Sequence, residues 1–460
     1  MASKLSVVAG LASLIACSQA ACASNCDSVE AGYQCSPEIS QNWGQYSPYF
    51  TVPSEIDASI PETCEITFVQ MLSRHGARDP TASKTAKYNA TIQAIQSSTT
   101  SYGAGYEFIA DYEYTLGADQ LTTFGQQELV NAGMKFFQRY EQMTRDTTPW
   151  FRSSGEERVV ESALNWTQGF HQARLASGGS SSDGYPWDIL TISEDEGVNN
   201  TLSHSLCTAF EDGPDSEIKD DARASWTAVF LPNITARLNA NLVGANITAD
   251  QTIYIMDLCP FNTVANSAGN ISEWCSLFTT EEWEQYGYYN TLDKYYGYGY
   301  GNPLGPTQGV GFTNELIARL TNTSVQDHTS TNTTLDSSSA TFPLGLPLYA
   351  DFSHDNDMTT IFSAMGLYNA TAALSNVTVE TTAETNGFSA SWLVPFAARM
   401  YVEKMTCAGV DEELVRVLVN DRVIPLETCG ADELGRCGLD AFVSSLTFAQ
   451  SGGFWDQCFV

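Results

Sequence analysis

The chain has 460 residues and carries 54 Asp and Glu against 21 Lys and Arg, so its formal net charge at pH 7 is −33. Nucleic acid is excluded as a partner, because a polyphosphate backbone requires a basic surface and no stretch of the chain gathers Lys or Arg. Intrinsic disorder is also excluded, since 43% of the residues are hydrophobic and 11% are aromatic. The length indicates two or three domains. The acidity either adapts the protein to an acidic medium, in which carboxylates lose their charge, or only keeps the protein soluble.

The N-terminal residues have the pattern of a secretory signal peptide. An apolar run at 5–16 follows Lys4 and is too short to span a bilayer. Cleavage after Ala23 leaves ten of the twelve cysteines, which permits five disulfide bonds, whereas cleavage after Ala20 leaves an odd number. We therefore assign residues 1–23 to the signal peptide and expect a secreted, extracellular protein without a membrane-spanning segment.

Ten Asn-x-Ser/Thr sequons support secretion. One such triplet carries little information, but ten beside a signal peptide indicate a glycosylated surface. We expect residues near these positions to lie outside the core. The sequons begin at Asn89, Asn165, Asn199, Asn233, Asn246, Asn270, Asn322, Asn332, Asn369 and Asn376.

Predicted strands alternate with predicted helices along the chain, which favours an α/β sheet covered on both faces. A threonine start and an apolar face predict a helix over residues 122–140. A hairpin that turns at Asn420-Asp421 makes part of the sheet antiparallel. The apolar, β-rich runs are at 66–72, 252–256, 348–352 and 414–419.

The middle of the chain has fewer strand signals than its flanks. We predict a smaller, mainly helical domain over residues 195–325, with residues 24–194 and 326–460 forming the α/β domain. The glycine- and tyrosine-rich stretch 295–312 does not complete a G-x-G-x-x-G pattern and is interpreted as a structured loop.

Two of the five histidines directly follow predicted strands. His75 follows the run at 66–72, and His354, which precedes Asp355, follows the run at 348–352. Open α/β sheets place their ligand crevice at the carboxyl ends of strands, so both histidines are candidate site residues. The other three are interpreted as structural or surface residues: His171, His204 and His328.

The residues around His75 suit phosphoryl chemistry. Arg74 and Arg78 flank it, and the planar arginine fork pairs with two phosphate oxygens at once. Nearby cations disfavour the charged imidazole, which keeps His75 neutral and nucleophilic in acid. Asp355 can protonate an alkoxide leaving group if its carboxyl is held protonated near pH ~4 to 5. The sequence has no H-E-x-x-H, paired C-x-x-C or G-x-S-x-G pattern, so we expect hydrolysis without a metal or other cofactor.

These motifs resemble those of the histidine acid phosphatases. Residues 74–80 read Arg-His-Gly-x-Arg-x-Pro, and the pair His354-Asp355 lies far along the chain. Over nearly all of the mature chain, further segments resemble the fungal phytases of that family; they span 121–125, 151–155, 301–309 and 349–356. The resemblance implies a phosphoglycerate-mutase-like α/β domain with a mixed central sheet, and a smaller α-helical domain with the active site between the two.

The resemblance also implies roles for individual residues. His75 would form a phosphohistidine, Asp355 would protonate the leaving oxygen of the inositol, and water would then release the phosphate. Arg158 is assigned a structural salt bridge. The phosphate ligands would be Arg74, Arg78, Arg152 and His354. The substrate rim would be formed by Gln45, Tyr46, Lys294 and Asn356.

Two positions of the rim depart from the pattern of the relatives. Asp293 precedes Lys294 where a second lysine is frequent, and Asp357 follows Asn356 where glycine is common. Both changes reduce the positive character of a pocket for a highly phosphorylated ring. The resemblance further implies five disulfides: Cys26–Cys35, Cys64–Cys407, Cys207–Cys458, Cys259–Cys275 and Cys429–Cys437.

Three hypotheses follow. The first is a secreted, monomeric acid phytase that hydrolyses myo-inositol hexakisphosphate. The second is a broad-specificity acid phosphatase with the same chemistry, which the rim separates from the first. The third is a catalytically silent secreted glycoprotein that binds anions, and the intact His75 and Asp355 weigh against it.

Overall fold

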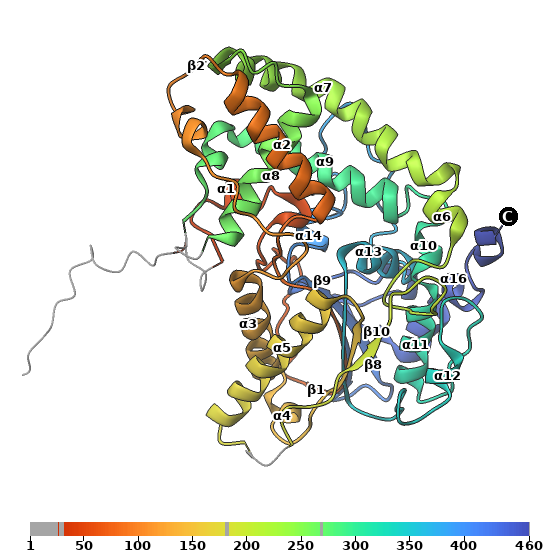
Figure 1. Cartoon of the computed structure of the whole chain (residues 1–460). Coiled ribbons are helices and arrows are strands. Elements are labelled where there is room, and N and C mark those ends of the chain that lie inside the picture. Colours follow the sequence, from red (N-terminus) through yellow and green to blue (C-terminus); the bar gives the residue numbers. More distant parts are fainter. Residues whose placement is uncertain (1–25, 27–31, 180–183, 267–269, 460) are drawn as a thin grey trace, which may run out of the picture.

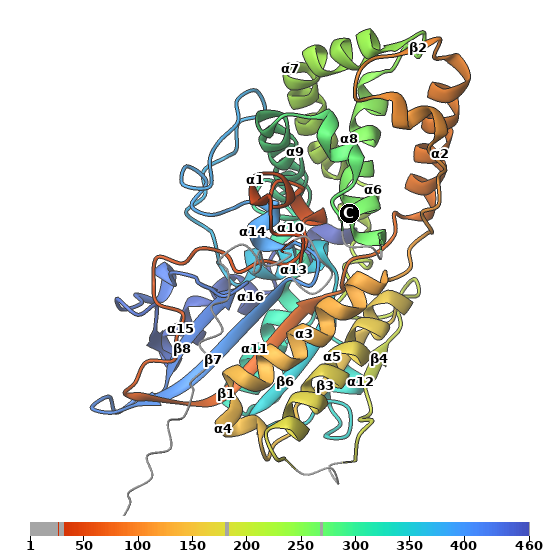
Figure 2. The same ribbon diagram turned by 90° about the vertical axis from the view of Figure 1, so that its left-hand side faces the viewer.

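The computed structural model describes residues 26, 32–179, 184–266 and 270–459 (Figure 1). The predicted signal peptide, residues 1–23, lies outside the described residues. Within the described ranges, none of the helices combines the length and the apolar character needed to cross a bilayer. A central sheet with helices on both faces occupies one end of the molecule, and a group of long helices occupies the other (Figure 2).

The central sheet is mixed, with the strand order β10-β8-β7-β1-β6-β3-β4 and with β9 paired to β8. The strands β1, β6, β3 and β4 are mutually parallel, whereas β7 and β8 run antiparallel to their neighbours. The fold class expected from the sequence is therefore confirmed. The strands span β1 (Cys64–Arg74), β3 (Trp150–Ser154), β4 (Leu190–Ile192), β6 (Leu348–Ser353), β7 (Arg399–Cys407), β8 (Leu414–Val419), β9 (Arg422–Val423) and β10 (Cys437–Gly438).

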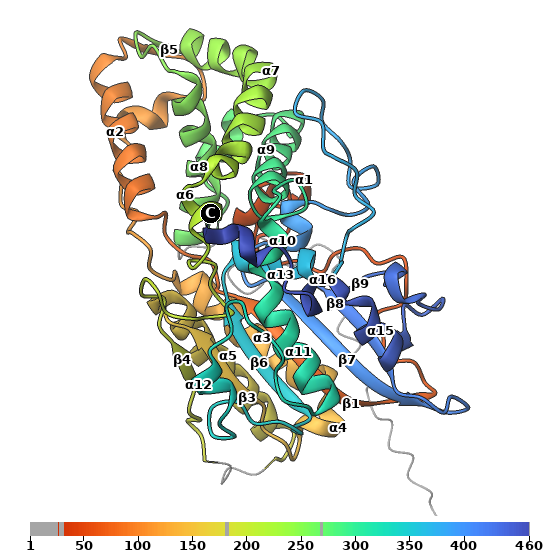
Figure 3. The same cartoon turned by 90° about the vertical axis from the view of Figure 1, so that its right-hand side faces the viewer.

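Side chains of β1 alternate between two apolar cores because successive residues of a strand point to opposite faces. Val69 and Met71 pack in the core on the α3 and α5 side, and Phe68 and Leu72 belong to the core that covers the other face. Figure 2 shows α3 and α5 against one face, and Figure 3 shows α11 against the other. These helices span α3 (Thr123–Arg139), α5 (Glu157–Ala176) and α11 (Val310–Thr321). A further helix, α13 (Asp355–Ala364), begins shortly after β6.

The helical group beyond the strand ends contains α2, α7, α8 and α9 (Figure 3). The helix α2 precedes residue 195 and packs beside α8; the domain boundaries at 194/195 and 325/326 stay predictions. The four helices span α2 (Ala82–Ser98), α7 (Ile218–Asn241), α8 (Ala249–Ala265) and α9 (Thr280–Tyr298). Shorter elements are α1 (Pro37–Ser40), β2 (Ser101–Tyr102), α4 (Glu141–Thr144), α6 (Thr208–Asp212), β5 (Leu242–Val243), α10 (Gly305–Gln308), α12 (Thr333–Asp336), α14 (Ala390–Leu393), α15 (Leu439–Ser445) and α16 (Thr447–Gln450).

Two of the local predictions are confirmed. The helix expected over 122–140 is α3, whose first turn is capped by the side chain of Thr122, which accepts a hydrogen bond from the Gly125 N–H. The expected hairpin is formed by β8 and β9. Its turn residues Asn420 and Asp421 have φ angles of 49° and 71°, the left-handed conformation that Asn and Asp tolerate well.

Two other local predictions are wrong. Residues 252–256 do not form a strand but lie inside α8, which starts with a capping box between Thr248 and Gln251. The stretch 295–312 is largely helical, because it includes the end of α9, all of α10 and the start of α11. The five disulfides implied by the resemblance are present: Cys26–Cys35, Cys64–Cys407, Cys207–Cys458, Cys259–Cys275 and Cys429–Cys437.

Candidate active site

The two candidate histidines meet at the carboxyl ends of adjacent parallel strands. Arg74 is the register partner of Ser353 in the β1–β6 pair, so His75 and His354 each lie one residue beyond this last pair. The backbone N–H of His75 donates to the carbonyl of Ser353 over 3.1 Å. The centroids of the two imidazole rings are 5.5 Å apart. The crevice expected at strand ends is therefore built from residues separated by most of the chain.

His75 is held as a buried, neutral imidazole, with 1% of its surface exposed. Its Nδ1 lies 2.8 Å from the carbonyl oxygen of Gly76. Since a carbonyl only accepts hydrogen bonds, Nδ1 carries the proton and Nε2 keeps its lone pair. Burial lowers the pKa of His75 well below its usual value, and the charges of Arg74 and Arg158 lower it further. The ring therefore stays neutral in acid, with a lone pair on Nε2.

The backbone of the loop that follows β1, residues 75–78, is fixed by α3 and α5. The Ala77 N–H donates to Oε2 of Glu128 on α3 over 2.9 Å, and the Gly76 N–H donates to Oγ of Ser162 on α5 over 3.1 Å. A Cβ on Gly76 would lie 2.3 Å from the carbonyl oxygen of Gly125, so only glycine allows this close approach. Burial raises the pKa of Glu128 to about 7. The loop is thus preorganised by contacts on both sides.

Three arginines present unpaired donors near His75. The Nε groups of Arg74, Arg78 and Arg158 are buried and have no hydrogen-bond partner among the described residues. Burial lowers the pKa of Arg74 to about 10, which still leaves the guanidinium charged in acid. Its Nη1 donates to the Val394 carbonyl over 2.7 Å, and its guanidinium lies 4.7 Å from the ring centroid of Phe396. Unpaired buried donors are costly unless a ligand satisfies them, so this cluster is suited to an anion.

The structure does not bring Arg152 to this cluster. Arg152 is the register partner of Asp351 within the β3–β6 pair, and its side chain lies 2.9 Å from that carboxylate and 2.6 Å from Glu315 on α11. Arg319 lies 2.8 Å from the same Asp351 and completes a buried ion network. The expected role of Arg152 as a phosphate ligand is therefore replaced by a structural one, because its guanidinium is engaged inside the fold.

Arg158 lies where Arg152 was expected. It is the second residue of α5 and lies four residues after the end of β3. Its charge is among those that lower the pKa of His75. Its acidic neighbours are Glu156, which ion-pairs with Nη1, and Asp119, 4.0 Å away. Sequence reasoning assigned Arg158 to a salt bridge, although its place after a strand end was the signal that identified His75 and His354.

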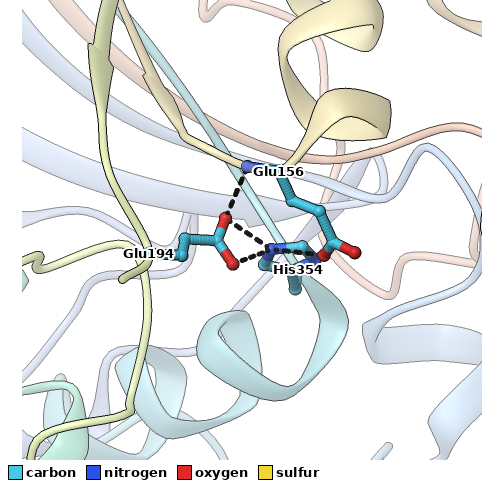
Figure 4. Close-up of side chains that lie close together, drawn as sticks. All are labelled: Glu156, Glu194 and His354. Atoms are coloured by element: carbon cyan, nitrogen blue, oxygen red, sulfur yellow. Dashed lines mark hydrogen bonds and ion pairs between the residues drawn. The ribbon is translucent and has the colours of Figure 1, made fainter. Parts of the chain in front are cut away.

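His354 is flanked by two carboxylates (Figure 4). Its Nε2 lies 3.0 Å from Oε1 of Glu194 and 3.6 Å from Oε2 of Glu156. Burial of Glu194 acts to raise its pKa, but the hydrogen bond and charge of His354 lower it to about 2. One ligand atom from each of these three residues lies within 4.8 Å of the other two, so the trio could also hold a metal ion. Neither glutamate was identified from the sequence.

Asp355 is held as an ionised carboxylate by two cations. Its Oδ2 lies 2.8 Å from Nζ of Lys294 and 3.5 Å from Nη2 of Arg74. Burial acts to raise the pKa of Asp355, but Arg74 and Lys294 hold it well below its usual value. The expectation of a carboxyl that is protonated near pH ~4 to 5 therefore does not hold while Asp355 is paired with Arg74 and Lys294. Lys294 also donates to Oδ1 of Asn356 over 2.6 Å.

The remaining rim residues lie close to this cluster. Gln45 and Tyr46 belong to a single helical turn; the carbonyl of Gln45 accepts a hydrogen bond from Arg74, and the ring of Tyr46 packs against Phe396. The four predicted rim residues therefore lie around Arg74 and Asp355. His204 instead pairs with Glu211 over 2.7 Å, His171 stacks on Tyr185 with ring centroids 4.1 Å apart, and His328 is exposed.

The two acidic departures of the rim are compensated. Asp293 pairs with Arg223 over 3.1 Å and with Lys294 over 3.3 Å. Asp357 is buried, and burial raises its pKa to about 6 despite the opposing charge of His204. In acid, Asp357 is therefore largely neutral, and Asp293 adds little net negative charge.

A neutral histidine at a strand end, surrounded by arginines with unpaired donors, is the arrangement of a phosphoryl-transfer site. Comparison with known proteins agrees. Residues 65–420 match the histidine phosphatase superfamily (branch 2). Phytase A of Aspergillus oryzae is 53% identical over 441 residues, covering 95% of this chain and 94% of its own, and Phytase A of Penicillium oxalicum is 50% identical over 439 residues, covering 94% of each chain. The chain belongs to the histidine phosphatase superfamily.

Solved structures share the fold. The phytase from D. castellii matches with a TM-score of 0.73 and 24% identity, over 91% of this chain and 87% of its own. The multiple inositol polyphosphate phosphatase of Bifidobacterium longum, in complex with phosphate, matches with a TM-score of 0.59 and 17% identity, over 89% of this chain and 98% of its own. At these identities the likeness establishes the fold alone.

Proposed function

We propose that the protein is a phytase, a phosphomonoesterase that hydrolyses myo-inositol hexakisphosphate in acid through a phosphohistidine on His75. The observation that carries the proposal is the neutral Nε2 of His75, which lies among arginines with unpaired donors. About half of the residues are identical to Phytase A relatives over nearly the whole chain. Because a deprotonated imidazole is the reactive form, burial allows attack at a pH that would protonate a free histidine.

In the first step, Nε2 of His75 attacks the phosphorus while the bond from phosphorus to the inositol oxygen breaks. Arg74, Arg78, Arg158 and His354 bind the phosphoryl oxygens and stabilise the charge on them. Asp355 gives its proton to the departing oxygen. In the second step, water attacks the phosphohistidine and Asp355 takes a proton from it, which releases phosphate and restores the neutral histidine.

Substrate binding favours protonation of Asp355. The dianionic phosphate engages the positive charges of Arg74 and Lys294, which otherwise hold Asp355 ionised. When their charge is shared with the phosphate, the pKa of Asp355 rises, and the carboxyl takes up a proton from an acidic medium. Protonation of the acid is thus coupled to occupation of the site.

Acid-quench trapping with labelled phytate tests the covalent step. Wild type is expected to retain phosphate on a histidine, His75→Ala to retain none, and Asp355→Asn to form the intermediate more slowly because the alcohol departs without its proton. Active wild-type enzyme without trapped phosphate would refute the mechanism.

A broad acid phosphatase remains the alternative, and the rim separates the two. The compensation of Asp293 by Arg223 and the neutral state of Asp357 in acid support phytate. The ratio of kcat/KM for phytate to that for a simple aryl phosphate decides: a strong preference for aryl phosphate at every acid pH contradicts the phytase proposal.

Secretion, glycosylation and a monomeric state belong to the same proposal. None of the ten sequon asparagines is buried, which supports attachment of glycans at these positions. The five disulfides fit an oxidising compartment. Mass measurement of the secreted protein before and after deglycosylation, with its N-terminal sequence, tests cleavage after Ala23.

A further inference from the structure

Glu194 lies at the same edge of the sheet as the two histidines. It follows the edge strand β4, whose last residue Ile192 pairs with Ser154 at the end of β3. Its Oε1 accepts hydrogen bonds from Nε2 of His354 and from the backbone N–H of Glu156, both over 3.0 Å. Figure 4 shows the carboxylate of Glu194 facing the imidazole.

The carboxylate of Glu194 is anchored independently of His354. The Glu156 N–H that binds it stands at the start of α5, so the anchor is backbone rather than a mobile side chain. The adjoining strand end is fixed in turn, because Nδ2 of Asn200 donates to Oγ of Ser154 over 3.1 Å. An acceptor held in this way fixes the orientation of the ring that donates to it.

Glu156 does not duplicate this contact. Its Oε2 lies 3.6 Å from Nε2 of His354 without a hydrogen bond between them, and its other oxygen is paired with Arg158. The side chain of Glu156 is 38% exposed, compared with 23% for Glu194. The two glutamates therefore place similar charge beside His354, but only Glu194 directs the ring.

We propose that Glu194 is a positioning residue that accepts the Nε2–H of His354 and so fixes the orientation of that ring beside the phosphoryl group. The inference rests on the proposed function, because it assigns the partner of a residue in that site. A hydrogen bond at one nitrogen of an imidazole ring also fixes the direction of the other nitrogen. In the Ser-His-Asp triad, loss of the carboxylate that orients the histidine lowers kcat severely.

Exchange of Glu194 tests the proposal. In E194Q the side chain keeps its shape but can present an N–H to Nε2, so we expect kcat to fall about 100-fold with KM and the melting temperature nearly unchanged. E194D keeps an acceptor and should recover about tenfold of the loss. The matched control is E156Q, which removes a charge at similar distance from His354 without removing a hydrogen bond to that ring; its kcat should stay within about threefold of wild type.

A spectroscopic measurement keeps the test independent of turnover. In protein with ¹⁵N-labelled histidine, the His354 signals, identified by their loss in His354→Ala, should show the Nε2–H tautomer when the ring is neutral and should change in E194Q. An unchanged tautomer with unchanged kcat would overturn the proposal, as would an equal loss in E156Q and E194Q. Failure of wild type to form a phosphohistidine would instead refute the proposed function.

Discussion

Arg152 lies within β3, and Arg158 follows that strand. Replacing each arginine in turn should separate effects on catalysis from effects on stability. Arg158→Met removes a charge beside His75 whose neighbours Glu156 and Asp119 are 38% and 41% exposed, so the lost ion pairs are worth about 0–1 kcal/mol. Removal of one donor to a developing anion costs about 10²–10³ in rate. We therefore expect kcat/KM to fall by about that factor in a protein of nearly normal stability.

Arg152→Met should have the opposite effect. The exchange leaves Asp351 and Glu315, both at most 3% exposed, with Arg319 as their remaining cation in this network. Removing one partner of a buried ion pair lowers the free energy of unfolding by about 3–5 kcal/mol. With an unfolding entropy of ~2.1 cal/mol/K per residue, a 460-residue chain changes by about 1 kcal/mol per degree, so the melting temperature should drop by about 3–5 °C.

Calorimetry and steady-state kinetics on the two purified variants distinguish these effects. Arg158→Lys, which keeps the charge but not the planar fork, serves as the control and should regain only part of the rate. If Arg152→Met lost catalysis at an unchanged melting temperature, or if Arg158→Met kept wild-type kcat/KM, the assignment of the two arginines would be refuted.

Three further exchanges test the site and the frame around it. Lys294→Met removes the ammonium 2.8 Å from Asp355, so the pKa of that carboxyl should rise and the descending limb of the pH profile of kcat/KM should move to higher pH; an unmoved limb would contradict the coupling. The pKa of Asp421 is lowered to about 2 because Arg399 and Lys135 outweigh its burial. Its contribution of about 2 kcal/mol is present above pH ~4 and is lost as the pH falls to ~2, so urea unfolding should show D421N to be weaker than wild type at pH 5 but not at pH 2. Serine at both Cys64 and Cys407 should cost about 2–5 kcal/mol in thermal unfolding while kcat stays unchanged, because the bond lies at the far end of β1 from the nucleophile; a loss of kcat in folded protein would show that the bond also shapes the site.

The meeting of His75 and His354 could be predicted from the sequence because its signals are local. His75 and His354 each follow an apolar run, and the rule that ligands bind at strand ends brings them together without knowledge of the fold. The helix over 122–140 could also be predicted from the sequence, since a threonine cap and one apolar face are enough to define it.

Predictions failed where burial decided the outcome. Residues 252–256 read as a strand because a short apolar run has no period that separates a buried strand from a buried helix, and α8 is enclosed on most sides. Arg152 and Arg158 are six residues apart, and strand alternation places the first toward α11 while the end of the strand brings the second to His75. The charge state of Asp357 could not be predicted from the sequence either, because its pKa depends on burial that only the fold creates.

The position of β1 in the sheet has a consequence for biosynthesis. This strand leaves the ribosome early, at residues 64–74, yet both of its neighbours come late, at Leu348–Ser353 and Arg399–Cys407. An apolar strand with two open edges must therefore wait until most of the chain has been translated before it can pair, a state that favours aggregation. Correct folding of this protein thus depends on protection of an early segment until the last quarter of the chain arrives, and yield during expression should respond to chaperone supply more than to the stability of the finished enzyme.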